Sequence, residues 1–138
     1  MSVSDREMIA SVKKWLVYAD EDIRLARHGL TLSSSVPYRL LAYHAQQCAE
    51  KCLKAYLVYR CIDFPYTHNI SMLLELCSRD ASWTVGLMDA EELTSYAITT
   101  RYPGIDEDVS REETLRAIQL ASLVMKTVTD ALAKEDFK

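Results

Sequence analysis

Residues 43–57, with the sequence YHAQQCAEKCLKAYL, gather the side chains of this chain that are best suited to chemistry. His44, Cys48 and Cys52 follow one another at four-residue steps, which would place them in one row on a helix and suggests a metal site. However, the first and third would lie about 12 Å apart along the helix axis, so one ion could bind at most two of them. We therefore expect no metal and interpret the cysteines as packing residues, since Cys is among the most buried residue types.

Arg39 and His44 form a second constellation, one that is suited to RNA cleavage. A histidine can move the proton while an arginine stabilises the charge on the phosphorane. Five residues on a regular helix rotate by about 140°, so these two side chains diverge. They could meet only if Arg39 lies in a distorted first turn, or if a second subunit supplies one of them.

The composition favours one helical domain that spans residues 1–138. The chain has only 3 Gly and 3 Pro among 138 residues, so long uninterrupted elements are expected. The net charge is −4 with acids and bases mixed, which argues against a strong general nucleic-acid binder. A local basic patch for RNA or a nucleotide remains compatible with this balance.

The segment MSVSDREMIASVKK at the start is charged throughout and lacks the apolar core of a signal peptide. No apolar run approaches the roughly 18 residues of a membrane span. We therefore expect a cytoplasmic protein that has no membrane contact, and whose 4 cysteines are reduced thiols.

Capping motifs and three- to four-residue apolar spacing predict the helices. The predicted capping boxes are Ser4 with Glu7 and Ser110 with Glu113, and Thr67 or Asn69 is expected to cap a short helix. The helices are expected at about 4–29, 37–60, 69–77, 87–101 and 110–133, and no segment has the pattern of a strand. The predicted fold is all-α, an antiparallel up-and-down bundle of four long helices plus one short helix.

The helix at 37–60 is expected to have one broad apolar face, formed by Leu41, Ala45, Cys48, Ala49, Cys52, Ala55, Tyr56 and Tyr59. Opposite this face lie Tyr43, Gln46, Glu50 and Lys54. His44, Gln47 and Lys51 occupy the border, where half-buried side chains can contact a ligand.

Three further residues outside this helix are candidate ligand contacts. His68 lies in a loop before a helix, and Arg101 and Tyr102 lie at the end of another. The scattered glycines exclude a Gly-rich phosphate loop, so any nucleotide must be held by side chains between helices. No cofactor is expected.

The segment HAQQCAEKCLKAYL at 44–57 resembles the signature helix of HEPN domains (higher eukaryotes and prokaryotes nucleotide-binding), of the small stand-alone prokaryotic type. The likeness continues through RCIDFPYTHNI at 60–70, and the segment from Tyr96 to Arg101-Tyr102-Pro103-Gly104 is similar to the region before the last helix of the family. Together these motifs cover about Trp15 to Val128. The resemblance implies a helical bundle, commonly homodimeric, whose relatives bind nucleotides or act as toxin ribonucleases. Their genes often lie beside one for a minimal nucleotidyltransferase.

Ribonuclease members of this family carry Arg-x4-6-His in a late helix, and here no histidine follows Arg101. The leading hypothesis is therefore a homodimeric binding module for a nucleotide, RNA or a minimal nucleotidyltransferase partner. The alternative is a metal-independent ribonuclease toxin of a toxin–antitoxin pair, with Arg39 or Arg101 and His44 or His68 at the dimer interface. A purely structural bundle is the third interpretation. Dimerisation is expected because the last helix looks too apolar on two faces for one bundle to hide.

Overall fold

The computed structural model describes residues 2–97, 108–135 and 137. These residues form five helices and no strand, which confirms the predicted all-α class. The elements are α1 (Val3–Gly29), α2 (Tyr38–Tyr59), α3 (Ile70–Ser78), the 3₁₀ helix η1 (Ser82–Tyr96) and α4 (Arg111–Lys134).

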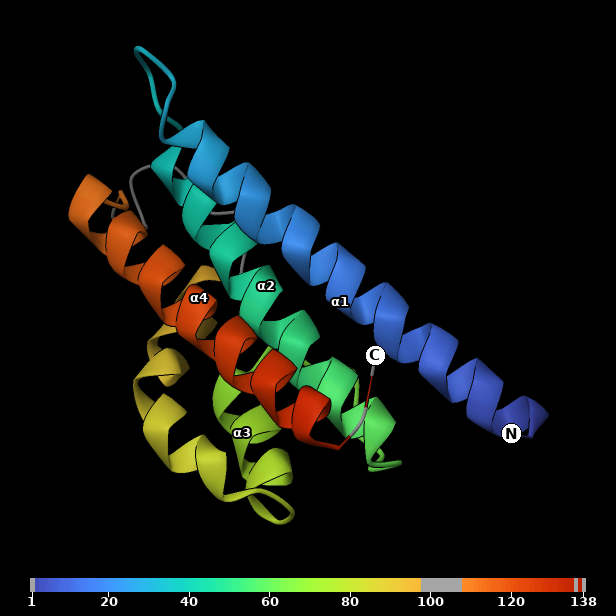
Figure 1. The fold of residues 1–138 in the computed structure, drawn as a ribbon. Helices are drawn as coiled ribbons and strands as arrows, with labels where there is room; N and C mark the ends of the chain where they lie inside the picture. The colour runs from blue at the N-terminus through green and yellow to red at the C-terminus, as the bar shows by residue number, and fades with distance from the viewer. Residues whose placement is uncertain (1, 98–107, 136, 138) are drawn as a thin grey trace.

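The three long helices lie side by side, with α2 between α1 and α4 (Figure 1). The chain runs one way along α1 and the opposite way along α2 and α4, as the colours show. To one side, α3 and η1 carry it back from the end of α2 toward the start of α4 (Figure 1). This is an up-and-down order in which η1 forms the third leg. In the described part of the chain, no helix is long and apolar enough to cross a bilayer.

Side-chain caps fix where the helices begin. The Ser110–Glu113 capping box at the start of α4 is confirmed, and so is Asn69 as the cap of α3. The box predicted at Ser4 is wrong, because Ser2 and Asp5 form it instead and α1 begins one residue earlier than Ser4. Both boxes satisfy backbone N–H groups that lack partners in the first helical turn.

The predicted helix at 87–101 differs from the observed element. The structure has a 3₁₀ helix that begins five residues earlier, at Ser82, and ends at Tyr96. Hydroxyl groups of Thr84 and Ser95 donate to the carbonyls of the residues three positions before them, Ala81 and Glu92, a pattern that fits this tighter winding. The predicted end at Arg101 lies outside the described residues.

The core forms around α2, which is buried on nearly all sides. Its predicted apolar face is confirmed, since Ala45, Cys48, Ala49 and Cys52 are fully buried. The prediction of an outer polar face is wrong, because Gln46, Glu50 and Lys54 are only 0%, 3% and 4% exposed. The segment 61–69 and α3 lie over that face and remove it from water.

Candidate functional site

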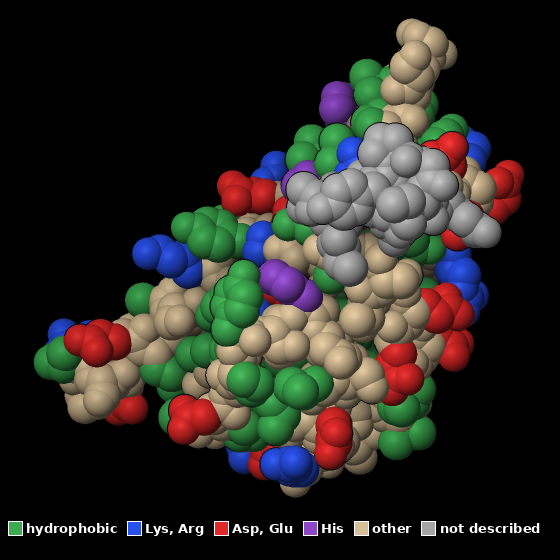
Figure 2. All heavy atoms as spheres, turned by 180° about the vertical axis from the view of Figure 1, so that it is seen from behind, with side chains coloured by type: hydrophobic (Ala, Val, Ile, Leu, Met, Phe, Trp, Pro, Cys, Tyr) green, Lys and Arg blue, Asp and Glu red, His purple; other side chains and the backbone are tan. Residues whose placement is uncertain are grey.

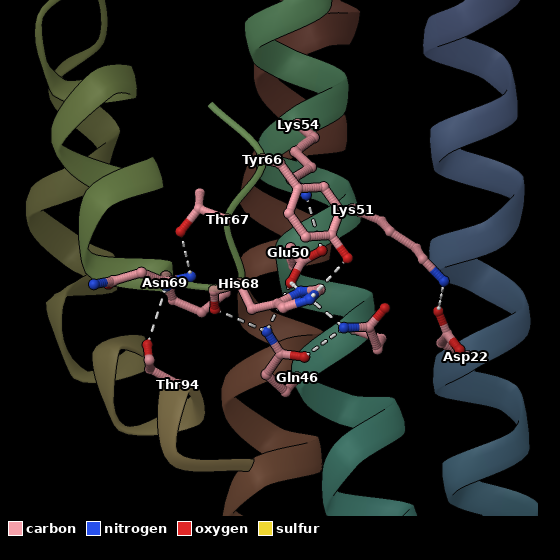
Figure 3. Close-up of polar contacts among 12 residues, drawn as sticks. Asp22, Gln46, Glu50, Lys51, Lys54, Tyr66, Thr67, His68, Asn69 and Thr94 are labelled. Carbon is pink, nitrogen blue, oxygen red and sulfur yellow. Dashed lines mark hydrogen bonds and ion pairs between the residues drawn. The ribbon is translucent and has the colours of Figure 1, made fainter. Parts of the chain in front are cut away.

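Two carboxylates organise the polar side chains along α2. Asp22 comes from α1 and binds His44 and Lys51, and we call these three residues the Asp22 cluster. Glu50 comes from α2 itself, and the Glu50 cluster consists of Gln46, Gln47, Glu50, Lys54 and His68. Figure 3 shows Asp22 and Lys51 beside the Glu50 cluster on α2, with α1 on one side and the 61–69 segment on the other.

The Asp22 cluster is a bridge between α1 and α2. His44 Nδ1 lies 2.8 Å from Asp22 Oδ1, and Lys51 Nζ lies 2.5 Å from Asp22 Oδ2. Asp22 is buried, whereas His44 and Lys51 keep part of their surface in solvent. The carboxylate therefore holds an imidazole and an ammonium group in fixed positions at the molecular surface.

Sequence analysis missed Asp22 as a site residue. The available signal was its position three residues after Ala19 and four before Ala26, both on the buried stripe of α1. A carboxylate at such a position needs a partner, because burying an unpaired charge is costly. Only the fold identifies that partner.

The Glu50 cluster is a buried network with one acceptor at its centre. Glu50 accepts from Gln46 Nε2 at 3.0 Å and pairs with Lys54 Nζ at 3.0 Å and His68 Nδ1 at 2.7 Å. Gln47 Nε2 donates to Gln46 Oε1 at 2.7 Å. The described residues contain no buried side-chain polar atom without a hydrogen-bond partner, so the network is satisfied.

The charge of Lys54 is compensated by aromatic rings as well as by Glu50. Its Nζ lies 5.6 Å from the ring centroid of Trp15, and 5.8 Å from those of Phe64 and Tyr66. Cations are attracted to the faces of aromatic rings at such distances. The lysine thus joins α1, α2 and the 61–69 segment around one buried charge.

Local hydrogen bonds hold His68 in place at the end of the 61–69 segment. Its carbonyl accepts from Gln46 Nε2 at 3.2 Å, and Thr67 Oγ1 accepts from the backbone N–H of Asn69 at 3.0 Å. The next N–H, that of Ile70, donates to Thr94 Oγ1 of η1 at 3.0 Å. The backbone on both sides of the imidazole is therefore fixed before any ligand arrives.

Aromatic side chains, two of them exposed, accompany the two clusters. Tyr66 is 89% exposed and packs edge-on against His68, with ring centroids 5.2 Å apart. Tyr43 packs edge-on against His44 at 5.3 Å, and burial raises the pKa of its phenol despite the nearby Lys51. Tyr18 is 46% exposed on α1, one helical turn before Asp22. Figure 2 shows a face on which histidine, basic and apolar side chains are interspersed.

The structure brings four predicted ligand contacts together and separates others. His44, Gln47, Lys51 and His68 all belong to the two clusters. Arg39 instead lies in the first turn of α2. It lines a hollow of about 390 Å³ together with Val36, Pro37, Tyr38, Leu40, Asp108 and Val109. Arg101 and Tyr102 lie outside the described residues.

The metal and cysteine interpretations can be compared with the same geometry. Cys48 and Cys52 are core residues with free thiols, as the packing interpretation predicted. His44 is engaged by Asp22 rather than by a thiol. Among the residues that the structure describes, no group of three or more His, Cys, Asp and Glu side chains is arranged to hold a metal ion.

Each histidine of the two clusters contacts a carboxylate through Nδ1, which directs the proton of the neutral imidazole to that nitrogen. The other nitrogen, Nε2, then has a lone pair that can accept a proton, and in the charged form it can donate to an anion. The arrangement is suited to proton transfer or to contact with a phosphate group.

The protonation of Glu50 makes stability depend on pH. Burial by itself would raise its pKa, but hydrogen bonds from Gln46, His68 and Lys54 together lower it. A carboxyl group whose pKa is lower in the folded state stabilises the fold above its unfolded value of about 4.3, and this contribution is lost as the pH falls through the folded pKa.

We therefore expect the urea midpoint to fall as the pH drops below about 4.3, and to fall less steeply in Glu50→Gln than in the unaltered protein. Urea unfolding followed by circular dichroism at each pH measures this difference. Parallel pH dependence in the two proteins would contradict it, since all other carboxylates are common to both.

Comparisons with known proteins extend over nearly the whole described fold. The HEPN domain profile matches residues 12–132. The crystal structure of TT1696 from Thermus thermophilus is similar with a TM-score of 0.70 and 28% sequence identity, over 86% of this chain and 96% of that chain. The crystal structure of ST0689, an archaeal HEPN homologue, is similar with a TM-score of 0.67 and 23% identity, over 88% of this chain and 97% of that chain.

A comparison with curated proteins gives no significant match. The all-helical order agrees with the profile match over residues 12–132. The chain belongs to the HEPN domain family.

Proposed function

We propose that this chain is a non-catalytic or weakly catalytic binding module that holds the phosphate of a nucleotide or RNA on the face formed by the two clusters. The bridging carboxylate of Asp22 carries this proposal, because it fixes His44 and Lys51 side by side. Lysine has three N–H donors, and the contact with Asp22 uses one, so donors remain for a phosphate oxygen. Exposed Tyr66 and Tyr18 offer ring faces on which a base can stack.

Substitution of Lys51 provides the sharpest binding test. We expect Lys51→Met and His44→Ala each to weaken binding about tenfold, as loss of one charge-assisted contact does. Fluorescence anisotropy with a fluorescein-labelled single-stranded RNA and with a fluorescent ATP analogue measures both affinities. The two probes distinguish RNA from free nucleotide.

Lys126 offers a matched control for this experiment. It also pairs with an aspartate, Asp130, with Nζ and Oδ2 2.9 Å apart, but the pair lies on the exposed surface of α4. Lys126→Met removes the same charge and should leave the affinity unchanged. Equal losses in Lys51→Met and Lys126→Met would indicate nonspecific electrostatic binding and contradict a site at Asp22.

We also propose that the module is a homodimer. Leu115 and Leu123 remain exposed on α4, whereas Ala117, Ala121, Val124 and Val128 are buried in the bundle, which supports a second apolar surface on this helix. Light scattering at micromolar concentration should give the mass of two chains, and the mass of one chain would contradict the proposed dimer. The family resemblance further supports a minimal nucleotidyltransferase as a protein partner, which co-purification of the two proteins tests.

A ribonuclease toxin is the second candidate, and one observation favours it. His44 and His68 are both oriented by carboxylates, as general bases often are. Incubation of RNA with purified protein, with His44→Ala, His68→Ala and Arg101→Ala alongside, separates the candidates. Cleavage that any of these substitutions abolishes favours the ribonuclease, whereas tight binding without cleavage favours the module.

A further inference from the structure

The Glu50 cluster reaches the surface through Tyr66, whose side chain is exposed. This contact suggests an activity beyond the proposed binding function. The hydroxyl of Tyr66 lies 3.3 Å from His68 Nε2, and His68 Nδ1 lies 2.7 Å from Glu50 Oε1. A buried carboxylate, an imidazole and an accessible phenol therefore stand in sequence (Figure 3).

The direction of the hydrogen bonds in this chain follows from its buried end. Glu50 is 3% exposed and binds Lys54, and its lowered pKa keeps it a carboxylate that can only accept. Nδ1 of His68 must then carry the proton, so Nε2 of the neutral ring is an acceptor. The Tyr66 O–H consequently donates to Nε2, and the imidazole is in place to receive that proton.

We propose that Glu50, His68 and Tyr66 form a nucleophilic site in which the Tyr66 hydroxyl takes up an acyl group from an activated ester or amide. A nucleophile bonded to a base that a third group orients is the general arrangement for such chemistry, and its distances are often loose before substrate binds. Tyr66 Oη attacks the acyl carbon while its proton passes to His68 Nε2. The tetrahedral adduct then expels the leaving group, which departs with the bonding electrons and takes the proton from Nε2.

We call Glu50, His68 and Tyr66 together the relay. Its surroundings favour this reaction at Tyr66 rather than at other tyrosines. Lys54 Nζ lies 5.8 Å from the Tyr66 ring centroid, so a positive charge is close to the phenol as it loses its proton. Within the described part of the chain, the imidazole pairs with the carboxylate of Glu50, which also binds Lys54. The phenol of Tyr43, on the same helix, lies near Glu50 and Tyr66. The hydrogen bonds of Gln46 and Thr67 fix the backbone that presents the imidazole.

Acetylation by N-acetylimidazole, read for each tyrosine by peptide mass spectrometry, tests the site without any nucleotide. Tyr18 is the internal control, since it is exposed and has no histidine contact among the described residues. If the rate followed exposure alone, the exposures of 89% and 46% would give about a twofold difference. General-base assistance is worth far more, so we expect Tyr66 to react at least about tenfold faster than Tyr18 at pH 7.5. In His68→Gln, Tyr66 should lose this rate advantage over Tyr18.

The pH profile of the unaltered protein decides the matter even if His68→Gln fails to fold. Reaction through the Glu50–His68–Tyr66 chain should level off as the pH rises, because the rate follows the fraction of neutral imidazole and cannot grow once all of it is neutral. Reaction through free phenolate instead rises about tenfold per pH unit up to about pH 10. A rate ratio near two, a continuous rise through pH 9, or an unchanged rate in folded His68→Gln would each overturn the proposal. Because the readout is acetylation, its failure leaves the nucleotide-binding proposal intact, and failure of nucleotide binding leaves the relay intact.

Discussion

Glu50→Ala is expected to lower the free energy of unfolding by about 3–5 kcal/mol, the usual cost of breaking a buried ion pair. The substitution leaves the ammonium group of Lys54 buried and without its carboxylate, since Lys54 is only 4% exposed. It also removes the acceptor for Gln46 Nε2 and His68 Nδ1. Urea unfolding at pH 7 measures the change, and a loss under about 1 kcal/mol would show that the network contributes little.

Asp20 provides a matched control for this prediction. The Asp20–Arg24 pair has the same four-residue spacing on a helix and a similar distance, 2.8 Å against 3.0 Å for Glu50–Lys54, but both its side chains are exposed. Asp20→Ala should therefore change stability by no more than about 0.5 kcal/mol. A large difference between the two variants would show that the buried pair with its hydrogen bonds stabilises the fold, and that a four-residue ion pair as such does not.

The double variant Glu50→Gln with Lys54→Met separates charge from hydrogen bonding. A glutamine oxygen can still accept from Gln46 and His68, and methionine fills the space of the lysine chain without its charge. Because no unpaired charge remains, we expect the double variant to recover more than half of the stability that Glu50→Ala loses. If the double variant does not recover this stability, the loss in Glu50→Ala comes from packing and not from the broken ion pair.

Gly29→Val is expected to destabilise the fold by about 2–3 kcal/mol through overpacking. A Cβ at this position would lie 2.3 Å from Leu41 Cδ2 and 3.0 Å from Cδ1, and Leu41 is itself buried. Valine adds two more methyl groups to the same contact between α1 and α2. Helix propensity alone would favour replacing this glycine, since glycine inside a helix costs about 1 kcal/mol relative to alanine. The expected loss of stability therefore has the opposite sign and comes from the contact with Leu41.

Gly86 is the control for this substitution. A Cβ built on Gly86 meets nothing within 4 Å, so Gly86→Val should stay within about 0.5 kcal/mol of the unaltered protein. Combining Gly29→Val with Leu41→Ala should regain part of the loss by making space. Equal effects at the two glycines, measured by urea unfolding, would contradict the close approach of α1 and α2.

The predicted end of the first helix at residue 29 is confirmed, but the reading of Gly29 as a helix cap is wrong. A glycine at the end of a helical pattern is typical of a cap with a left-handed backbone. Here the cap residue is Leu30 with an ordinary helical conformation, and Gly29 is the last helical residue. The position is needed because Leu41 of α2 occupies the space of a side chain, a contact that the sequence does not reveal.

The sequence by itself determined the four described α-helices, the caps of α3 and α4, and the packing face of α2. These features depend on interactions between residues three or four positions apart, such as Ser110 with Glu113, or on the periodic burial of small residues such as Ala45 and Ala49. It also contained the histidines and lysines of the candidate site, together with the motif that indicates the HEPN family.

Only the tertiary structure decided what those side chains do. On an isolated helix Gln46, Glu50 and Lys54 form the polar outer face, but the 61–69 segment and α3 cover them and turn them into a buried network. Asp22 is 22 residues from His44 and 29 from Lys51, yet it holds both. Burial and long-range pairing depend on which elements pack together. The periodicity of one helix cannot supply that information, since the same polar side chain is stable in water or in a satisfied network.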